Sequence, residues 1–255
     1  MKQIPNVFTL LNLLFGCLAI TAALQNPLVI QYTQDGQPYI SMAEKLWLSS
    51  IFIFLAAIID FADGFLARLL KAQSEIGKQL DSLSDVVSFG VAPSMIMYQF
   101  LKISIVQESI AIDSSIAWLI PAFLIATCSA YRLAKFNLDI SQRSHFKGVP
   151  TPAVGLLIAS FPLIYWYASN PVYVEVMTNK WFLYGITAGL SYLMVSDIPM
   201  MSLKFKGLSI SENLPRYLLL ASSALTFVLI SWVAVPIIFI GYIILSLIYR
   251  KQIQQ

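Results

Sequence analysis

The sequence predicts an all-α membrane protein, a polytopic helical bundle with about eight transmembrane helices and both termini in the cytoplasm. Of 255 residues, 58 % are hydrophobic and 11 % are charged, which is about half the charged share of a soluble domain. The apolar residues gather in long runs, and Lys and Arg gather in alternate connecting segments. We find no internal repeat and no long linker, so we expect one membrane domain over residues 1–255.

Eight apolar runs predict the helices. Several runs are shorter than the roughly 20 residues that a bilayer requires, so we expect the helices to extend about a turn beyond them. The first run follows a lone Lys2 with no evident cleavage site, and we expect it to be retained. The expected spans are residues 7–24, 46–67, 86–101, 116–133, 153–168, 181–195, 217–232 and 235–249.

The last two runs are expected to form two helices and not one. A single helix over residues 217–249 would be about 50 Å long, whereas the hydrocarbon core is about 30 Å thick. Pro236 has no backbone donor and disfavours helix in the residue before it, so we expect the turn near this proline.

The distribution of basic residues predicts the orientation, because cytoplasmic loops collect Lys and Arg. With both termini inside, all basic residues except Lys45, Lys102 and Lys180 fall on the cytoplasmic side. Fusing the last two spans would move Arg250 and Lys251 to the opposite side. We therefore expect a multi-pass protein of the cell (inner) membrane. The slight basic excess concerns orientation, and no nucleic-acid partner is predicted.

Two segments outside the spans carry no predicted chemistry. The external segment 25–45 contains the turn formers Asn26, Pro27, Gly36 and Pro38 and is interpreted as a surface loop. His145, the one histidine of the chain, lies in a cytosolic loop and is not predicted to be catalytic.

Four aspartates stand out in this apolar chain. Asp60 and Asp63 are spaced i and i+3, and Asp81 and Asp85 are spaced i and i+4, so each pair shares one helix face. The second span runs inward and the third, which is expected to start near Asp81, runs outward. All four carboxylates should therefore meet near the cytosolic boundary, on one helical hairpin.

Such a cluster indicates bound cations. An ionised side chain costs about 2.5 to 3.5 kcal/mol at the centre of a membrane helix, and crowding four of them adds repulsion. Hard carboxylate oxygens suit Mg²⁺ or Mn²⁺, and four of them suggest two divalent cations. The alternative is that the aspartates are solvated helix caps. It stays open for Asp81 with Ser82, but it does not suit Asp60 and Asp63, which lie among Ile58, Ile59, Phe61 and Phe65.

Small and basic residues accompany the aspartates. Gly64 and Ala67 present a bare patch beside Asp63, and Gly77 lies one turn before Asp81. Small residues in membranes mark places where backbones or ligands come close. Arg68 follows the patch and offers a planar fork that suits phosphate oxygens. Alternatively, the small residues only pack helices and Arg68 is an interfacial anchor.

Together the letters read D-x-x-D-G-x-x-A-R, eight residues, then G-x-x-x-D-x-x-x-D, with the aspartates at 60, 63, 81 and 85. This pattern resembles the signature of the CDP-alcohol phosphotransferase family, and every fixed position is filled. Further stretches resemble its phosphatidylserine synthase branch, so the resemblance covers nearly the whole chain. These stretches are IPNVFTLLN, DSLSDVVSFGVAPS, AYRLAKFNLD, FKGVPTPA and LMVSDIPMMSLKFKG. Eight predicted helices exceed the six of the family core, as this branch leads us to expect.

The resemblance implies a chemistry and a set of roles. Such enzymes transfer a substituted phosphate from a CDP-linked donor to an alcohol and release CMP; for this branch the donor is CDP-diacylglycerol and the acceptor L-serine. Asp60, Asp63 and Asp81 would bind metal, and Asp85 would complete the second metal site and act as general base. Gly64 and Ala67 would leave room for the nucleotide, and Arg68 would hold phosphate. A homodimer is the family expectation.

Polar residues elsewhere are weaker candidates. Serine carries a carboxylate and an ammonium group, so its site should offer a basic side chain. Arg132 and Asn137, in the cytosolic segment after the fourth span, are the preferred acceptor-side candidates. Lys135 and Lys147 lie nearby, and Lys135 is better explained as a positive-inside anchor.

Polar residues near the start of the chain and at the end of the sixth span raise two further questions. Asn6 and Thr9 could reach cytidine from the membrane surface, although Asn6 could simply cap the first helix. Asp197, beside Ser196 and Pro199, is interpreted as a turn or cap residue.

Two rival functions remain at this point. A sister enzyme using glycerol 3-phosphate or inositol (phosphate) would share the whole signature. A cation-coupled transporter would also carry intramembrane carboxylates, but such proteins often show inverted repeats and paired broken helices, and we find neither.

Overall fold

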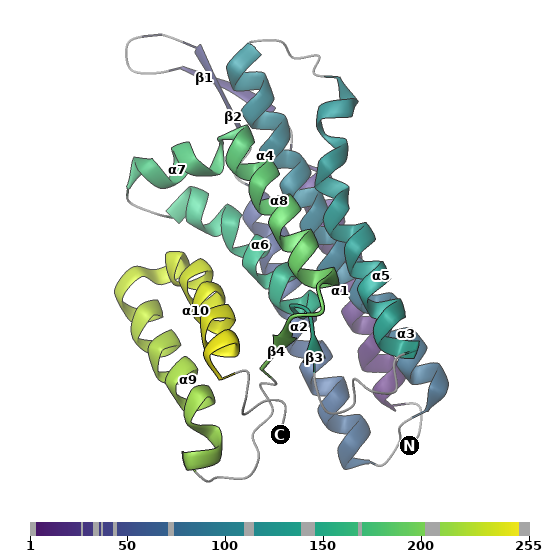
Figure 1. Cartoon of the computed structure of the whole chain (residues 1–255). Helices are drawn as coiled ribbons and strands as arrows, with labels where there is room; N and C mark the ends of the chain where they lie inside the picture. The colour runs from purple at the N-terminus through teal and green to yellow at the C-terminus, as the bar shows by residue number, and fades with distance from the viewer. Residues whose placement is uncertain are drawn as a thin grey trace.

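The computed structural model describes residues 4–26, 28–32, 36, 38–42, 45–70, 74–109, 115–138, 146–167, 170–201 and 210–249. Long helices dominate this part of the chain, and two small two-stranded sheets complete it (Figure 1). The all-α class predicted from the sequence is confirmed.

The first two helices, α1 (Ile4–Leu24) and α2 (Leu46–Leu69), pack against each other. The segment between them differs from the expected surface loop, because β1 (Leu28–Tyr32) pairs antiparallel with β2 (Pro38–Met42). Apolar and β-branched residues favour these strands, and Gly36 adopts φ +76° in the turn region. Figure 1 places this hairpin at the end of the bundle opposite to the start of α1.

The third helical stretch begins earlier than the sequence predicted. It consists of α3 (Glu75–Asp85), the π-helix η1 (Val86–Val91) and α4 (Ala92–Ser109). Ser74 caps α3, accepting a hydrogen bond from the backbone nitrogen of Gly77 at 3.0 Å. Asp81 therefore lies well inside the helix, so its interpretation as a cap residue is wrong.

Close backbone contacts surround η1. A Cβ atom added at Gly16 of α1 would lie 2.9 Å from Ser88 Cα, and one added at Gly155 would lie 3.0 Å from Phe89 Cα. A Cβ added at Gly90 would meet Ser129 Oγ at 2.9 Å. The π-helix thus makes close contacts with three neighbouring segments. These contacts restrict the backbone positions of the residues that follow Asp85.

The middle of the chain forms the rest of the main bundle. Pro121 falls where the expected fourth span becomes two short 3₁₀ turns, η2 (Ile116–Trp118) and η3 (Ile120–Phe123), before the α-helix begins. A short antiparallel sheet joins the segments that follow α5 and α8. The remaining elements are α5 (Leu124–Leu138), β3 (Phe146–Lys147), α6 (Thr151–Tyr167), α7 (Pro171–Met177), α8 (Lys180–Val195) and β4 (Pro199–Met200).

The last two predicted spans form separate helices that pack as a hairpin, as expected. These are α9 (Ile210–Ile230) and α10 (Ala234–Ile248), joined by the 3₁₀ turn η5 (Ser231–Val233). Pro236 lies in the first turn of α10, where its missing N–H leaves no bond unmade. Figure 1 shows this C-terminal hairpin beside the main bundle, with α10 closer to it than α9.

Five stretches of the described residues are long and apolar enough to cross a membrane. They are Pro5–Leu24, Leu46–Leu69, Glu75–Gln107, Ile116–Leu138 and Asn213–Ile248, and Thr151–Tyr167 is a shorter apolar helix. The structure thus agrees with a membrane-embedded protein, while eight crossings and the orientation stay predictions.

The contact between α1 and η1 leads to a prediction about stability. Replacing Gly16 by Ala forces a methyl group against the Ser88 backbone, and overpacking of this kind costs about 1 to 3 kcal/mol. We expect Gly16→Ala to lower the thermal unfolding temperature of the detergent-solubilised protein. Gly185→Ala is the matched control, because nothing lies within 4 Å of a Cβ at that helical glycine. Equal unfolding temperatures for the two variants would contradict the close contact.

Candidate active site

The four predicted carboxylates come together at one end of the bundle. Asp60 and Asp63 of α2 and Asp81 of α3 each offer a carboxylate oxygen, and these atoms lie within 4.8 Å of one another. Asp85, one turn after Asp81, is 7 % exposed, and its carboxyl group interacts with that of Asp60. Two neighbouring helices therefore concentrate four acidic groups in one place.

Helix α1 holds these carboxylates through its own polar residues. Thr9 Oγ1 donates to Asp63 Oδ2 at 2.8 Å, and Asn12 Nδ2 donates to Asp85 Oδ1 at 3.3 Å. Ser84 Oγ donates to the carbonyl oxygen of Thr9 at 3.1 Å. Thr9 and Asn12 are three residues apart, so they share a face of α1.

Asn12 was not singled out in the sequence, although a signal was present. A fully buried asparagine inside an apolar run requires polar partners, and its spacing from Thr9 matches the helix period. Its Oδ1 atom is buried with no hydrogen-bond partner among the described residues. Asn12 therefore belongs to the polar surroundings of Asp85.

A large cavity opens beside the cluster. Its volume is about 720 Å³, within the range of about 300 to 1,000 Å³ that is usual for ligand sites. Nothing lies within 4 Å of a Cβ built at Gly64, so this glycine faces open space. The lining includes the predicted residues Asn6, Thr9, Asp60, Asp63, Gly64, Ala67, Arg68 and Asp81.

Basic side chains also line this cavity. Arg68 donates from Nε to the carbonyl oxygen of Gly64 at 2.8 Å, which keeps its guanidinium beside the glycine. Lys78 of α3, which the sequence analysis did not single out, lies on the wall as well. The cavity thus combines carboxylates that attract cations with cations that attract phosphate.

The first turn of α1 closes another side of the cavity. Asn6 Oδ1 would lie 3.1 Å from a Cβ added at Gly77, so the glycine lets α1 approach α3. Asn6 therefore lies where a bound nucleotide would be within reach.

Arg132 of α5 is a further charged neighbour of Asp85. It is 8 % exposed, and its guanidinium interacts electrostatically with the Asp85 carboxylate. Nη1 donates to Thr151 Oγ1 at 3.5 Å, while Nε is buried with no hydrogen-bond partner among the described residues. A buried cation with so few partners is costly, so an anionic group that paired with Arg132 would relieve this cost.

The other acceptor-side candidates have different surroundings. Asn137 Nδ2 donates to Ser82 Oγ at 2.8 Å, and Lys78 Nζ donates to the Asn137 carbonyl oxygen at 3.2 Å. Asn137 therefore connects α5 to α3, and its partner Ser82 directly follows Asp81 in the chain. It does not line the cavities described here, and its place in an acceptor site stays a prediction.

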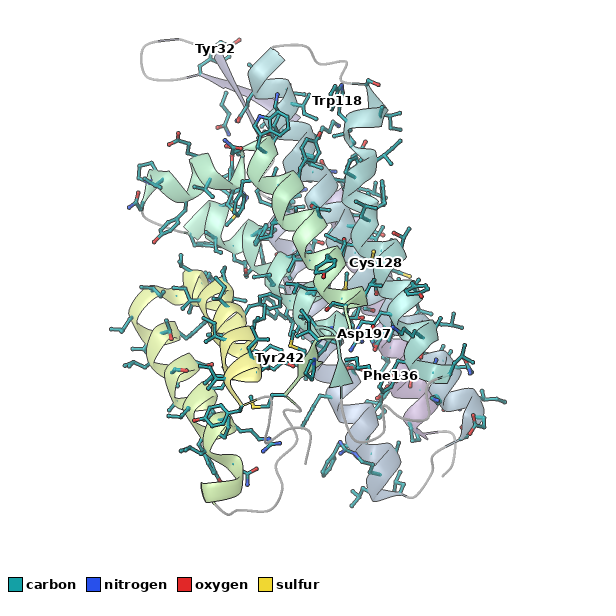
Figure 2. All side chains as sticks on the ribbon, viewed as in Figure 1. Tyr32, Trp118, Cys128, Phe136, Asp197 and Tyr242 are labelled. Atoms are coloured by element: carbon teal, nitrogen blue, oxygen red, sulfur yellow. The ribbon has the colours of Figure 1, made fainter. Side chains whose placement is uncertain are left out.

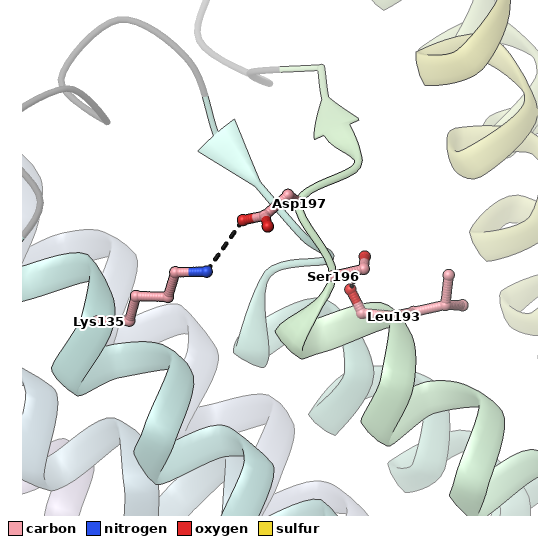
Figure 3. Close-up of polar contacts among 4 residues, drawn as sticks. All are labelled: Lys135, Leu193, Ser196 and Asp197. Carbon is pink, nitrogen blue, oxygen red and sulfur yellow. Dashed lines mark hydrogen bonds and ion pairs between the residues drawn. The ribbon is translucent and has the colours of Figure 1, made fainter.

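Lys135 and Asp197 form an ion pair, which the sequence analysis did not anticipate. Their Nζ and Oδ1 atoms are 2.9 Å apart, and Ser196 Oγ donates to the Leu193 carbonyl oxygen (Figure 3). The Asp197 side chain is 72 % exposed, so solvent screening keeps the strength of this pair low. Lys147 and Lys135 also line a small cavity with Arg132. His145 lies outside the described residues.

The carboxylate cluster fits a divalent cation. Asp60, Asp63 and Asp81 present oxygens close enough for one ion to be shared, and carboxylate oxygens are the ligands that Mg²⁺ and Mn²⁺ prefer. A cation there would also offset the mutual repulsion of the four acidic groups.

A helical membrane bundle with such a cluster beside a basic-lined cavity suits a membrane-embedded enzyme that handles phosphate-bearing substrates. Residues 2–193 match the CDP-alcohol phosphatidyltransferase family. The chain therefore belongs to this family, and it is an enzyme.

Several similar proteins carry names that state an enzymatic activity. The chain is similar to "CDP-diacylglycerol--serine O-phosphatidyltransferase" of Bacillus subtilis (strain 168), with 32 % identity over 198 residues covering 78 % of this chain and 89 % of the relative. A protein of the same name from Mycobacterium bovis shares 32 % identity over 258 residues, covering 95 % and 76 % of the two chains. The one from Methanocaldococcus jannaschii shares 38 % over 147 residues, covering 57 % and 60 %.

The carboxylate geometry predicts metal binding that can be measured directly. We expect purified protein to bind Mn²⁺. Binding is measured as the loss of the free Mn²⁺ signal in electron paramagnetic resonance. Asp81→Asn removes one shared ligand and should weaken this binding by about tenfold or more, equivalent to about 1.4 kcal/mol. Asp197→Asn is the matched control, because it changes an exposed aspartate outside the cluster. Equal Mn²⁺ affinity in the two variants would place the metal elsewhere.

Proposed function

We propose that this enzyme transfers the phosphatidyl group of CDP-diacylglycerol to the hydroxyl of L-serine, giving phosphatidylserine and CMP, with the help of two divalent cations. The observation that carries the proposal is that Asp85 interacts both with the other three aspartates, which line the cavity of about 720 Å³, and with Arg132. Arg132 is buried, and its Nε atom has no hydrogen-bond partner among the described residues.

The large cavity suits the donor. Its volume can hold a nucleotide diphosphate headgroup. The open space at Gly64 and the short side chain of Ala67 leave room for the nucleotide, while Arg68 is placed to hold phosphate oxygens. Asn6 and Thr9 line the same cavity from α1 and are proposed to contact the cytidine portion.

The Thr9 hydroxyl has a second contact besides the cavity. Because it donates to Asp63 at 2.8 Å, it also orients this carboxylate. Asp60, Asp63 and Asp81 would hold the cations, with Asp85 completing the second site. Bound cations would neutralise the charge of the pyrophosphate and stabilise the departing CMP.

Asp85 is the proposed general base. In the transfer, the acceptor hydroxyl gives its proton to the Asp85 carboxylate, and the acceptor oxygen forms a bond with the phosphorus that carries the diacylglycerol. The bond between that phosphorus and the oxygen of CMP breaks, and CMP takes the electron pair. The Asn12 amide, which donates to Asp85 Oδ1 at 3.3 Å, keeps the other carboxylate oxygen directed for this role.

Arg132 is the proposed partner of the serine carboxylate. A guanidinium pairs with a carboxylate through parallel hydrogen bonds, and its buried Nε atom lacks a partner among the described residues. Serine bound there would have its hydroxyl near Asp85, because Arg132 and Asp85 interact electrostatically. Asn137 donates to Ser82. Its proposed contribution to the acceptor site is therefore indirect, through the position of α5.

The proposal includes the membrane arrangement. Eight crossings with both termini in the cytoplasm would place the site at the cytoplasmic face of the inner membrane. The start of α1 and the end of α5 lie at one end of the bundle (Figure 1). The positive-inside rule assigns most Lys and Arg of the sequence to the cytoplasmic segments. Acyl chains then stay in lipid while serine arrives from water. A homodimer is the family expectation.

A sister activity remains the alternative. An enzyme that uses glycerol 3-phosphate or inositol (phosphate) would share the aspartate cluster and the donor cavity. The names of the relatives favour serine. Membership of a transferase family removes the interpretation as a cation-coupled transporter.

The acceptor is tested by direct assay. Purified protein in detergent with CDP-diacylglycerol and Mg²⁺ or Mn²⁺ is supplied in turn with labelled serine, glycerol 3-phosphate, inositol and inositol phosphate. We expect CMP release and labelled phosphatidylserine with serine. CMP release with one of the other acceptors and none with serine would replace the proposed acceptor.

The role of Asp85 predicts a separation of binding from turnover. Asp85→Asn removes the proton acceptor and should lower kcat by about a hundredfold to ten-thousandfold, while binding of CDP-diacylglycerol stays measurable. Glu175→Gln, an exposed acidic residue of α7, is the control that should keep activity. Loss of donor binding together with turnover would make Asp85 chiefly a metal ligand.

A further inference from the structure

Two helices each place a basic residue on the wall of the large cavity. Arg68 lies near the end of α2, and Lys78 lies near the start of α3. They are the basic residues of the described lining. Arg68 is the basic position of the family signature, whereas Lys78 stands outside that signature.

Lys78 lies close to the carboxylate cluster along α3. Asp81 follows it by three residues, a spacing that places the two side chains on neighbouring parts of one helix face. Gly77, directly before Lys78, lines the same cavity and adds no side chain to it. The Lys78 side chain is exposed, so a ligand that enters from water can reach its ammonium group.

A network of hydrogen bonds joins Lys78 to the end of α5. Lys78 Nζ donates to the Asn137 carbonyl oxygen at 3.2 Å, and Asn137 Nδ2 donates to Ser82 Oγ at 2.8 Å. Ser82 Oγ in turn donates to the Lys78 carbonyl oxygen at 3.2 Å. Figure 2 labels Phe136, the residue before Asn137, near the end of α5. The network restricts the positions that the Lys78 side chain can adopt.

The partner that orients Lys78 is a neutral group. An ammonium group has three donors, and a carbonyl oxygen that accepts from one of them leaves the positive charge uncancelled. Lys135 differs, because its ammonium group is paired with the Asp197 carboxylate. Orienting a flexible side chain in advance lowers the entropic cost of binding a ligand. Lys78 is therefore oriented in advance and keeps its charge for an anionic ligand.

The charges around the cavity favour a second basic contact for the donor. Two divalent cations would offset the four ionised aspartates, whereas each phosphate of the donor diphosphate brings a further negative charge. Glu75 also lines the cavity and adds to this negative charge. Arg68 can pair with one phosphate, and Lys78 is the other basic residue of the described wall.

We propose that Lys78 binds the donor diphosphate together with Arg68, so that α2 and α3 each supply a basic contact to the phosphates. This inference rests on the proposed function, in which the large cavity takes a CDP-linked donor. It adds to the donor site a residue that the family signature does not contain. Because the Lys78 ammonium group also donates to Asn137, the donor site and the end of α5 share this side chain.

The competing explanation is that Lys78 only connects α3 to α5. Lys78→Met removes the ammonium group and keeps an unbranched side chain, whereas Lys78→Arg keeps the positive charge. Ser82→Ala removes the hydrogen bond between α3 and the Asn137 side chain and leaves the Lys78 ammonium group in place. Lys180→Met is the matched control for the loss of one positive charge. Lys180 begins α8, lies over the Trp181 ring and does not line the cavity.

The first measurement is the binding of CDP to the full-length protein in detergent with Mg²⁺, by isothermal titration calorimetry. We expect Lys78→Met to weaken CDP binding by about tenfold, the effect of one hydrogen bond to a charged group. Lys78→Arg, Ser82→Ala and Lys180→Met should stay within about threefold of the parent. Unchanged CDP affinity in Lys78→Met, or an equal loss in Ser82→Ala, would overturn the inference.

A second substitution keeps the test valid if Lys78→Met lowers the thermal unfolding temperature. Lys78→Gln loses the charge and still has an N–H donor at the end of its side chain. We expect it to weaken CDP binding by about tenfold as well. CDP affinity in Lys78→Gln equal to that of the parent would show that the charge is not used and would overturn the inference.

Steady-state kinetics separate a donor contact from a displaced helix. Lys78→Met should raise the KM for CDP-diacylglycerol by about tenfold and leave the KM for serine within about twofold of the parent, because the lost contact is with the donor. A KM for serine that rises as much as the KM for the donor would indicate a displacement of α5 and would overturn the inference.

The CDP measurement also separates this inference from the proposed function, because it requires no acceptor. If the parent binds CDP but transfers to another alcohol, the proposed acceptor is wrong and the comparison of the Lys78 variants keeps its meaning. If the parent and Lys78→Met bind CDP equally well, the inference alone is overturned. A parent that does not bind CDP would overturn both the proposed donor and the inference.

Discussion

The mutual repulsion of four carboxylates in an apolar bundle is the constraint on which this structure depends. The groups are brought together by the hairpin of α2 and α3, and α1 supplies the hydrogen bonds that hold two of them, through Thr9 and Asn12. These bonds do not cancel the repulsion, because they are donated by neutral groups. Divalent cations would cancel it, so metal binding and the stability of this end of the bundle are expected to be linked.

Asp85 connects two sides of the molecule with different origins. The proposed donor side is made by α1, α2 and α3, which contain the whole family signature and line the large cavity. The proposed acceptor side draws on α5 and α6, through Arg132 and Thr151. This division suits a family in which the donor chemistry is shared and the acceptor varies. Residues that choose the acceptor can change without disturbing the carboxylates, provided that Asp85 keeps its contacts with both sides.

The sequence predicted the aspartate cluster because the spacing within each pair and the short turn between the helices leave few alternatives. It also predicted the division between α9 and α10, since one helix would be too long for a bilayer. It placed the start of the third helix too late. The segment Glu75–Asp85 is polar on much of its surface, and the prediction relied on the apolar run that follows it. The cap at Ser74 marks the start of the helix. The β1–β2 pairing was missed although a signal was present, because the turn formers were interpreted as a surface loop and the apolar and β-branched residues beside them were not. The Lys135–Asp197 contact joins residues far apart in the chain, and no local pattern links them.

The π-helix after Asp85 explains how one helix serves both a crowded site and a tightly packed core. An α-helix running without interruption from α3 into α4 would keep one register, so the face that turns Asp81 and Asp85 toward α2 would determine the face that packs further on. The wider turn of η1 shifts this register between the two parts. The new face brings Ser88 against α1, Phe89 against Gly155 and Gly90 against Ser129. These contacts leave no space for larger side chains, so they stabilise the register shift. The orientation of Asp85 therefore depends on the packing of residues one turn away from its carboxylate.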